Sequence, residues 1–373
     1  MKTVCNENQC TGCMACVDIC AKNAIHIVDA IDAFNAVIDE GKCVNCGMCE
    51  KVCQQKNVPQ LRSPIIWKQG WTYDDKTRMR SASGGIATEL ARTFIEKGGK
   101  VFRGGNFVFD IVEDVNRLDC FAGSKYIKSN PIGIYKTIKR ELAKETEILF
   151  IGLPCQVVAL RNYVGDSLSE RLTTIDLICH GTPSPKILDM FLKQYGEDIH
   201  KVTSIDFRVK GNFQVSEKTR TIATRGVCDR YMISFLTALS YTENCYSCKY
   251  AQEKRPGDIT LGDSWGTELP ENEWKKGISL ILCQTEKGIT LSESANVKIV
   301  DVNVDKAKSH NHQLEHPSKA PKSREKFIKH IKHGMKFNRA VLLALPKDCG
   351  KQAVKEILIK CKLLAPGGGN VSN

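Results

Sequence analysis

The sequence predicts a small α+β domain at the N-terminus, followed by an α/β core whose C-terminal part is rich in strands. Two runs of four cysteines, separated by two short alternating apolar segments, occupy residues 10–53. Beyond them, apolar runs typical of buried strands alternate with segments of helical periodicity, a pattern that favours an α/β core. At 373 residues the chain is too long for one compact core and suits two or three domains.

Each cysteine run has the spacing C-x2-C-x2-C-x3-C of bacterial two-cluster ferredoxins. The runs are Cys10, Cys13, Cys16, Cys20 and Cys43, Cys46, Cys49, Cys53. We expect each fourth cysteine to start a helix and to reach the other cluster. The two predicted [4Fe–4S] sites are therefore Cys10, Cys13, Cys16, Cys53 and Cys43, Cys46, Cys49, Cys20. Structural zinc is the alternative, but zinc usually takes paired cysteine hooks, often with histidine. The proline that ends the ferredoxin pattern is replaced by Ala21 and Gln54, and proline is not a ligand.

The remaining elements are predicted in chain order from these patterns. Residues 1–58 form the ferredoxin-like domain, with a hairpin of Ile25–Val28 and Ala36–Ile38, and the proline-containing stretch Asn57–Pro64 is a linker. Residues 67–200 form the first part of the core, with strands at Gly70–Tyr73, Lys100–Phe109 (interrupted by Gly104-Gly105), Glu147–Gly152 and Thr173–Cys179. Residues 201–340 carry further strands at Val202–Lys210, Asp258–Gly262 and Ser279–Gln284. Residues 341–373 form a helical or disordered tail, of which Gly367–Asn373 is expected to be disordered.

The formal net charge of +12 overstates the basic character of the loaded protein. A [4Fe–4S]²⁺ cluster with four thiolates carries about −2, so three clusters would reduce the charge to roughly +6. That excess fits a protein that binds anionic cofactors or an acidic redox partner, and no nucleic-acid motif is visible. The sequence shows neither a signal peptide nor an apolar run of roughly 18–20 residues that would span a membrane, so we expect reduced cysteines and a cytoplasmic protein.

Four further cysteines occupy positions that suit a metal site. Cys155 and Cys179 each follow a predicted buried strand, where α/β folds build their sites. Cys245 and Cys248 form a C-x2-C pair in a polar loop. A single cysteine is more often a small buried apolar residue, but the four together make a credible ligand set. No role is predicted for Cys5, Cys120, Cys228, Cys283, Cys349 and Cys361.

Two glycine-containing segments suggest an anionic cofactor. Ser83, Gly84 and Gly85 precede a segment of helical spacing, and the free N–H groups and dipole of a helix start favour a phosphate. The segment Gly123, Ser124, Lys125 and Tyr126 offers a glycine turn, a cation and an aromatic ring. The first segment matches neither a Walker motif nor G-x-G-x-x-G, and a helix entry without a ligand is the open alternative.

Six ordered stretches of the chain resemble the coenzyme F420 hydrogenase/dehydrogenase beta-subunit family, in its bacterial form with an N-terminal two-cluster ferredoxin domain. The stretches are residues 81–90, 123–126, 152–156, 179–184, 245–250 and 257–266, within roughly residues 67–330. The resemblance implies that the α/β core binds a flavin, FAD rather than FMN, near residues 83–85 and 123–126. It also implies a third [4Fe–4S] cluster, on Cys155, Cys179, Cys245 and Cys248.

The function that follows is an oxidoreductase that exchanges electrons between ferredoxin, or another one-electron redox protein, and a substrate at the flavin. A flavin handles electron pairs and clusters carry single electrons. The small-molecule substrate is not assigned, and coenzyme F420 is one possible hydride carrier. The alternatives are a non-catalytic electron-transfer subunit of a larger complex and a core that uses only its clusters.

Three smaller signals concern the same region. His180 follows Cys179 and is the candidate proton donor, with a supporting role as the alternative. Arg78 precedes the helix and is a candidate for binding a pyrophosphate, with a solvated surface position as the alternative. Trp265 is a candidate for covering the cofactor, with simple packing as the alternative.

Overall fold

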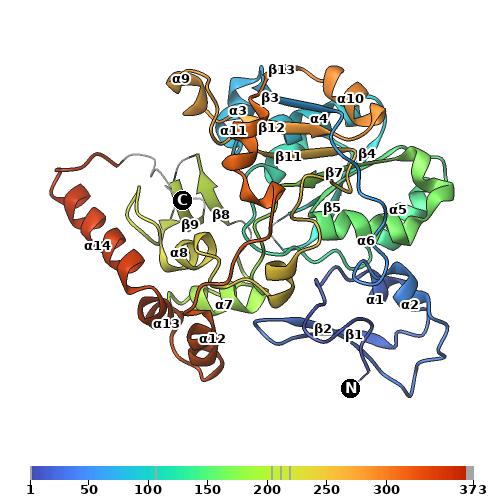
Figure 1. The fold of residues 1–373 in the computed structure, drawn as a ribbon, viewed down its shortest axis with the longest axis horizontal. Coiled ribbons are helices and arrows are strands. Elements are labelled where there is room, and N and C mark those ends of the chain that lie inside the picture. Colours follow the sequence, from blue (N-terminus) through green and yellow to red (C-terminus); the bar gives the residue numbers. More distant parts are fainter. Residues whose placement is uncertain (1, 106, 203–204, 211, 218–219, 367–373) are drawn as a thin grey trace.

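The computed structural model describes residues 2–105, 107–202, 205–210, 212–217 and 220–366 (Figure 1). Its N-terminal module contains an antiparallel hairpin and two one-turn helices, as expected for a small α+β domain. The elements are α1 (Ala15–Ile19), β1 (Ile25–Asp29), β2 (Phe34–Ile38) and α2 (Met48–Val52). The expectation that each fourth cysteine starts a helix is wrong, because Cys20 and Cys53 follow the last helical residue. Met14 and Gly47 adopt left-handed conformations with φ of 64° and 72°, which turn the chain into each helix before the third cysteine.

One eight-stranded mixed sheet forms the centre of the core. Its strands, in spatial order, are β13 (Val297–Asp301), β3 (Ile66–Thr72), β12 (Ser279–Cys283), β11 (Ile259–Asp263), β7 (Leu172–Leu177), β6 (Ile148–Gly152), β4 (Lys100–Gly104) and β5 (Phe109–Val112). The four neighbours β11, β7, β6 and β4 are parallel, and antiparallel strands extend the sheet on both sides. Strands from both sides of residue 200 therefore lie in one sheet.

The central strand β6 is a continuous apolar run because both of its faces are covered by apolar side chains. Every residue of β6 is buried. Helices α4 (Ile86–Glu96) and α10 (Glu286–Glu293) cover one face, whereas α5 (Ile134–Leu142) and α6 (Pro154–Val164) cover the other. Leu149 and Ile151 point into the first layer, and Ile148 and Phe150 into the second, as the two-residue period of a strand requires.

The segment 100–109 departs from its prediction as one interrupted strand. It contains the whole of β4 and the first residue of β5, because the chain reverses after Gly104 and β5 pairs with β4 in antiparallel fashion. Gly105 N donates a hydrogen bond to Val108 O at 2.8 Å, which closes the turn. The glycine pair therefore marks a hairpin rather than a bulge.

A second apolar core lies beside the sheet and is mainly helical. Its helices are α7 (Pro185–Lys193), α8 (Arg230–Leu236), α12 (Arg324–Lys332), α13 (Phe337–Ala344) and α14 (Pro346–Lys360), and its strands are β8 (Asp206–Val209), β9 (Asn212–Glu217) and β10 (Arg220–Thr221). The remaining elements are α3 (Asp75–Arg80), α9 (Glu271–Trp274), α11 (Val304–Ser309) and short 3-10 helices at Val115–Phe121, Asp166–Arg171, Glu243–Ser247 and His312–Leu314. The predicted tail is helical up to Lys360, and its expected disordered end lies outside the described residues. Within the described chain, no helix has the length and apolar character needed to span a membrane.

The N-terminal module docks on the core beneath α5 and α6 (Figure 1). Asp18 Oδ1 accepts a hydrogen bond from Gly133 N at 2.7 Å, at the start of α5. On the other side of the module, Ser184 Oγ donates to Asp29 Oδ2 at 2.5 Å. These contacts hold the eight-cysteine module against the side of the sheet where β6 and β7 end.

Candidate functional site

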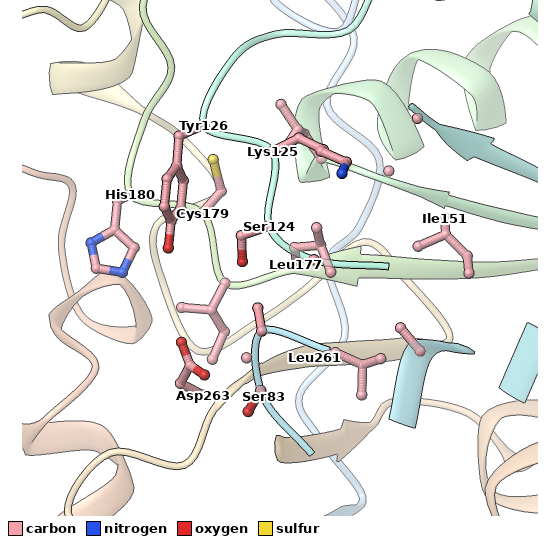
Figure 2. A pocket seen from close by; sticks show the side chains of 18 of the residues that line it. Ser83, Ser124, Lys125, Tyr126, Ile151, Leu177, Cys179, His180, Leu261 and Asp263 are labelled. Carbon is pink, nitrogen blue, oxygen red and sulfur yellow. The ribbon is translucent and has the colours of Figure 1, made fainter. Parts of the chain in front are cut away.

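A cavity of about 270 Å³ opens at the carboxyl ends of the parallel strands (Figure 2). Parallel α/β sheets place their ligand sites at this edge, and the cavity is close to the lower end of the range of roughly 300–1,000 Å³ for small-molecule sites. Three segments that are distant in the sequence form its walls. They are the loop before α4 with Ser83 and Gly85, the segment 123–127, and the segment 177–182 after β7.

The loop before α4 is held tightly against the sheet. Ser83 Oγ donates to Ile278 O at 2.7 Å, and Gly84 N donates to Ser279 Oγ at 3.0 Å. Gly85 caps α4 with a φ of 83°, a conformation that glycine adopts without strain. Ser83, Gly85 and the first residues of the eleven-residue helix α4 line the cavity, whereas Gly84 faces the sheet. The arrangement directs the start of a helix toward the cavity, which suits an anionic group.

Gly84→Ala is predicted to destabilise the protein and to displace this loop. An added Cβ would lie 2.3 Å from Gly70 O and 2.8 Å from Ser279 N, so backbone atoms would have to move. We expect a loss of about 3 kcal/mol in the free energy of unfolding, at the upper end for overpacking. Gly350→Ala is the control, because its Cβ meets no atom within 4 Å in α14 and should stabilise the helix by about 1 kcal/mol. Urea unfolding of both variants tests the prediction, and equal stability of the two would contradict it.

The segment Gly123, Ser124, Lys125 and Tyr126 forms the opposite wall, and Figure 2 shows its side chains around the cavity. Tyr126 packs on Phe235 with ring centroids 4.4 Å apart. Burial raises the pKa of Tyr126, so its hydroxyl stays protonated at neutral pH. Tyr231 donates a hydrogen bond from its hydroxyl to Tyr126 O at 2.7 Å, which fixes the backbone of the wall.

Asp263 and Trp265 line the mouth of the cavity. Asp263 is the last residue of β11, and Trp265 lies two residues further on. Arg208 Nη1 lies 2.6 Å from Asp263 Oδ2, and the Arg208 guanidinium stacks on the Trp265 ring at 5.3 Å from its centroid. Trp265 is 41% exposed, so its ring forms part of the rim.

Arg78 is not brought into this cavity. Its side chain is buried, with Nη1 on Glu273 Oε2 at 2.8 Å and Nε on Gly277 O at 3.1 Å. The guanidinium also covers the Trp71 ring at 4.4 Å from its centroid. These protein partners occupy the donors that we expected to face a pyrophosphate, because α3 directs Arg78 toward α9 instead. Its side chain instead joins α3 to α9 and to the backbone at Gly277.

Arg103 is a cavity residue that the sequence did not reveal. It lies near the end of β4, and its Nη1 is buried with no hydrogen-bond partner among the described residues. Burial lowers the pKa of Arg103 to about 10, and the group remains charged at neutral pH. A buried, unsatisfied guanidinium nitrogen calls for an anionic or electron-rich partner. The predicted strand end before Gly104-Gly105 is the signal that could have identified it.

His180 lies where this cavity meets a second, smaller one. Its ring faces the cavities. The surrounding protein removes the ring from bulk water, and this desolvation lowers the pKa of His180 to about 4. The imidazole is therefore neutral at neutral pH. Its Nδ1 is 2.8 Å from Gln313 Nε2, and its carbonyl oxygen accepts from Ser318 Oγ at 2.7 Å.

The second cavity, of about 30 Å³, is lined by Cys155, Cys179, Cys245 and Cys248. Cys155 lies in the first turn of α6 after β6, and Cys179 follows β7, so the pairing of these parallel strands sets the two cysteines side by side. The other two lie in and after the 3-10 helix Glu243–Ser247. Within the described residues, no three cysteine, histidine or carboxylate side chains form a group suited to a single metal ion.

A buried ion pair holds the Cys245–Cys248 loop in place. Arg255 Nη2 lies 2.7 Å from Asp176 Oδ1, and both side chains are at most 1% exposed. Arg255 also donates to Tyr250 O at 2.5 Å and to Leu177 O at 2.7 Å. The loop is thus fastened to β7, which carries Cys179 at its end.

The chemistry of the second cavity fits an iron–sulfur cluster. Burial raises the pKa of Cys155 and Cys179, and it raises the pKa of Cys248 to about 11, so the thiols are poor anions without a bound cation. Thr182 Oγ1 and Asn244 Oδ1, from residues that line this cavity, are buried without partners among the described residues. Four thiols around a cavity with spare polar groups match the ligand set of a [4Fe–4S] cluster.

In the N-terminal module, the structure places Cys53 beside Cys10, Cys13 and Cys16. The four are buried, whereas Cys46 is exposed and Cys20, Cys43 and Cys49 are half-buried. Cys5 is buried among the first group, and hydrogen bonds from its thiol help to lower the pKa of Cys53 to about 6. Cys5 is therefore part of the surroundings of this site, a role that the spacing of the two runs does not indicate.

An eight-cysteine module joined to an α/β core with a further cysteine-lined cavity defines an iron–sulfur protein of the electron-transfer class. The resemblance to the coenzyme F420 hydrogenase/dehydrogenase beta-subunit family that the sequence motifs predict is confirmed by a family model over part of the chain. Residues 145–306 match the family model for the C-terminal part of the coenzyme F420 hydrogenase/dehydrogenase beta subunit, and residues 9–57 match the 4Fe-4S dicluster domain.

Among solved structures, the chain is similar to a chain of the xenon-derivatised F420-reducing [NiFe] hydrogenase complex from Methanosarcina barkeri. The two are 16% identical with a TM-score of 0.49, and the match covers 74% of this chain and 95% of that one. A search of curated proteins found no match.

Proposed function

We propose that the chain is a flavin- and iron–sulfur-dependent oxidoreductase that transfers electrons between ferredoxin and a substrate at the flavin. One observation carries the proposal: the two cavities share a wall. Leu153, Cys179 and the segment 180–182 line both the cysteine cavity and the larger one. A cluster ligand therefore lies in the wall of the space that would hold the flavin, and such contact is what electron transfer between the two groups requires.

The larger cavity has features that fit FAD. The loop before α4 offers backbone N–H groups to phosphate, and Arg103 supplies a buried positive charge whose Nη1 has no partner among the described residues. Ser124 and Tyr126 contribute hydroxyls to the wall opposite the loop. The flavin would supply the conversion between electron pairs and single electrons. Because His180 is neutral, it would accept a proton or a hydrogen bond at the junction of the cavities rather than donate a proton from an imidazolium.

The substrate would bind at the mouth, beside Asp263, Arg208 and Trp265. The Arg208 side chain is only 8% exposed and lies between Asp263 and the rings of Phe213 and Trp265. These contacts hold its positive charge in a fixed position at the rim. A planar, electron-rich hydride carrier of the coenzyme F420 kind is one candidate for this position, and ferredoxin would exchange electrons with the N-terminal module.

Anaerobic purification followed by iron and flavin analysis tests this function. We expect three [4Fe–4S] clusters, or about twelve iron atoms, with one FAD per chain. Reduced ferredoxin should then support reduction of an added acceptor. Iron without flavin would overturn the flavin part of the proposal, and zinc alone would overturn all of it.

The second candidate is an electron-transfer subunit without a substrate of its own. The match to a beta-subunit family favours it, because a beta subunit works beside other chains. Purification from the native cell distinguishes the two functions. A partner in stoichiometric amount supports the subunit, whereas activity of the chain alone supports the enzyme.

Arg103→Met is predicted to weaken flavin binding. The variant keeps an unbranched side chain of similar length but removes the charge of a residue that lines the cavity. A lost charged hydrogen bond of about 1.5–3 kcal/mol corresponds to a roughly ten- to hundredfold rise in the dissociation constant. Titration of the flavin-free protein with FAD measures this change. Arg117→Met is the control, because Arg117 pairs with Asp110 at the surface and its loss should leave FAD affinity unchanged.

A further inference from the structure

A buried lysine, Lys128, lies between the N-terminal module and the cysteine cavity of the core. The residue is 6% exposed. Its Nζ donates a hydrogen bond to Thr11 O and lies 5.5 Å from the centroid of the Phe34 ring, and both of these residues belong to the N-terminal module. Lys128 also lines the cavity formed by Cys155, Cys179, Cys245 and Cys248. One buried ammonium group thus contacts both sides of the boundary.

No carboxylate among the described residues forms an ion pair with this ammonium group. Its neutral partners are a carbonyl oxygen and an aromatic ring, which together do not replace the hydration of a full charge. A buried cation of this kind requires anionic surroundings. Thiolate-ligated iron–sulfur clusters are anionic, and Lys128 lies close to thiols of both cysteine groups.

Two neutral side chains continue the same bridge. The Tyr250 hydroxyl donates to Gln54 Oε1 at 2.5 Å, and Gln54 Nε2 donates to Thr11 Oγ1 at 2.9 Å. Gln54 directly follows Cys53, and Tyr250 lies two residues after Cys248. The position where two-cluster ferredoxins carry a proline is therefore occupied here by an amide that joins the module to the core.

These contacts distinguish the two cysteine groups of the module. The group with Cys10 and Cys53 is buried against the bridge, whereas the group with Cys46 reaches the surface. We call the buried group with Cys10 and Cys53 the inner site of the module and the group with Cys46 the outer site. The positive charge of Lys128 therefore acts on the inner site and on the cysteine cavity of the core. Its effect on the outer site is smaller because distance and solvent reduce it.

We propose that Lys128 is a positioning and potential-setting residue shared by the inner cluster of the module and the cluster of the core, and that electrons cross between module and core at this point. The inference rests on the proposed function for the core cluster. A nearby positive charge favours the more negative, reduced form of a cluster, so Lys128 raises the reduction potentials of both neighbours. The outer cluster is the end that exchanges electrons with the external protein.

Redox titration of the loaded full-length protein, monitored by electron paramagnetic resonance, tests this role with Lys128→Met and Lys128→Arg. For the methionine variant we expect two of three clusters to titrate at lower potential. A tenfold fall in the one-electron equilibrium constant corresponds to about 59 mV. The arginine variant keeps the charge and should restore both potentials. Lys56→Met is the matched control, since the exposed Lys56 lies near Cys53 but is paired with Glu50 at 2.7 Å and screened by water.

Each outcome decides the question. Unchanged potentials in a fully loaded Lys128→Met protein would overturn the proposal, and so would an equal shift of all three clusters. The role is supported if the methionine variant keeps its iron with two shifted potentials and the arginine variant has normal potentials. If only the methionine variant loses iron, full iron and normal potentials in the arginine variant support the need for a positive charge at this position. Loss of iron in both variants overturns the role in favour of simple packing. The iron and flavin content of the unmodified protein tests the proposed function separately, and a protein with only two clusters still reports the shift of the inner one.

Discussion

Replacing Cys155 by alanine is expected to remove about one third of the iron and to abolish electron transfer from ferredoxin to the acceptor, with the flavin retained. Alanine suits this position because Cys155 lies in the first turn of α6, where alanine is a strong helix former. The side chain contributes a thiol to the cysteine cavity and little to the packing of the sheet. The loss should therefore affect the cluster and spare the fold.

The measurements are iron and flavin content, followed by acceptor reduction with ferredoxin and then with a small two-electron donor. The small donor should still reduce the acceptor, because its electrons need not pass through the core cluster. Cys228→Ala is the control, since Cys228 is half-buried and lies in no cysteine group of the described structure. Full iron content in the Cys155 variant would show that this residue is not a ligand.

The grouping of the cysteines and the main strands can be predicted from the sequence because their signals are local. The double four-cysteine run has a fixed spacing, and the continuous apolar run of β6 can only be a buried strand or helix segment. Cys155 and Cys179 are predictable as neighbours because adjacent parallel strands end at one edge.

The residues that the sequence does not reveal depend on long-range contacts. In the sequence, Arg103 and Lys128 look like ordinary surface cations, and only the fold places Arg103 in the cavity wall and buries Lys128. Arg78 precedes the glycine loop, which predicts that it faces the cofactor, yet Glu273, almost 200 positions later, holds its guanidinium. Cys5 lies outside the repeated spacing but packs beside Cys10 and Cys53 in space. A charged residue reveals its role only when the groups that surround it are known.

Breaking the buried ion pair of Arg255 and Asp176 is expected to destabilise the core much more than breaking an exposed pair. Arg255→Met leaves Asp176 buried without its partner and should lower the free energy of unfolding by about 3–5 kcal/mol. It also frees the loop with Cys245 and Cys248, so iron content should fall by up to about one third. Burial raises the pKa of Asp176 even beside Arg255. A carboxyl with a raised folded pKa destabilises the protein only once it ionises, so the defect should grow as the pH rises from acid to neutral.

The double variant Asp176→Asn/Arg255→Met separates the charge from the packing. Asparagine at 176 can still accept the hydrogen bond from Gly257 N, which is 2.8 Å from Asp176 Oδ2, and it carries no charge. We expect the double variant to recover about 1–3 kcal/mol relative to Arg255→Met and to lose the pH dependence. Lys275→Met, which removes an exposed pair with Glu271, should change stability by about 0.5 kcal/mol or less. Anaerobic urea unfolding at two pH values measures all three variants, and a double variant no more stable than Arg255→Met would show that the guanidinium acts through its hydrogen bonds to the loop rather than through its charge.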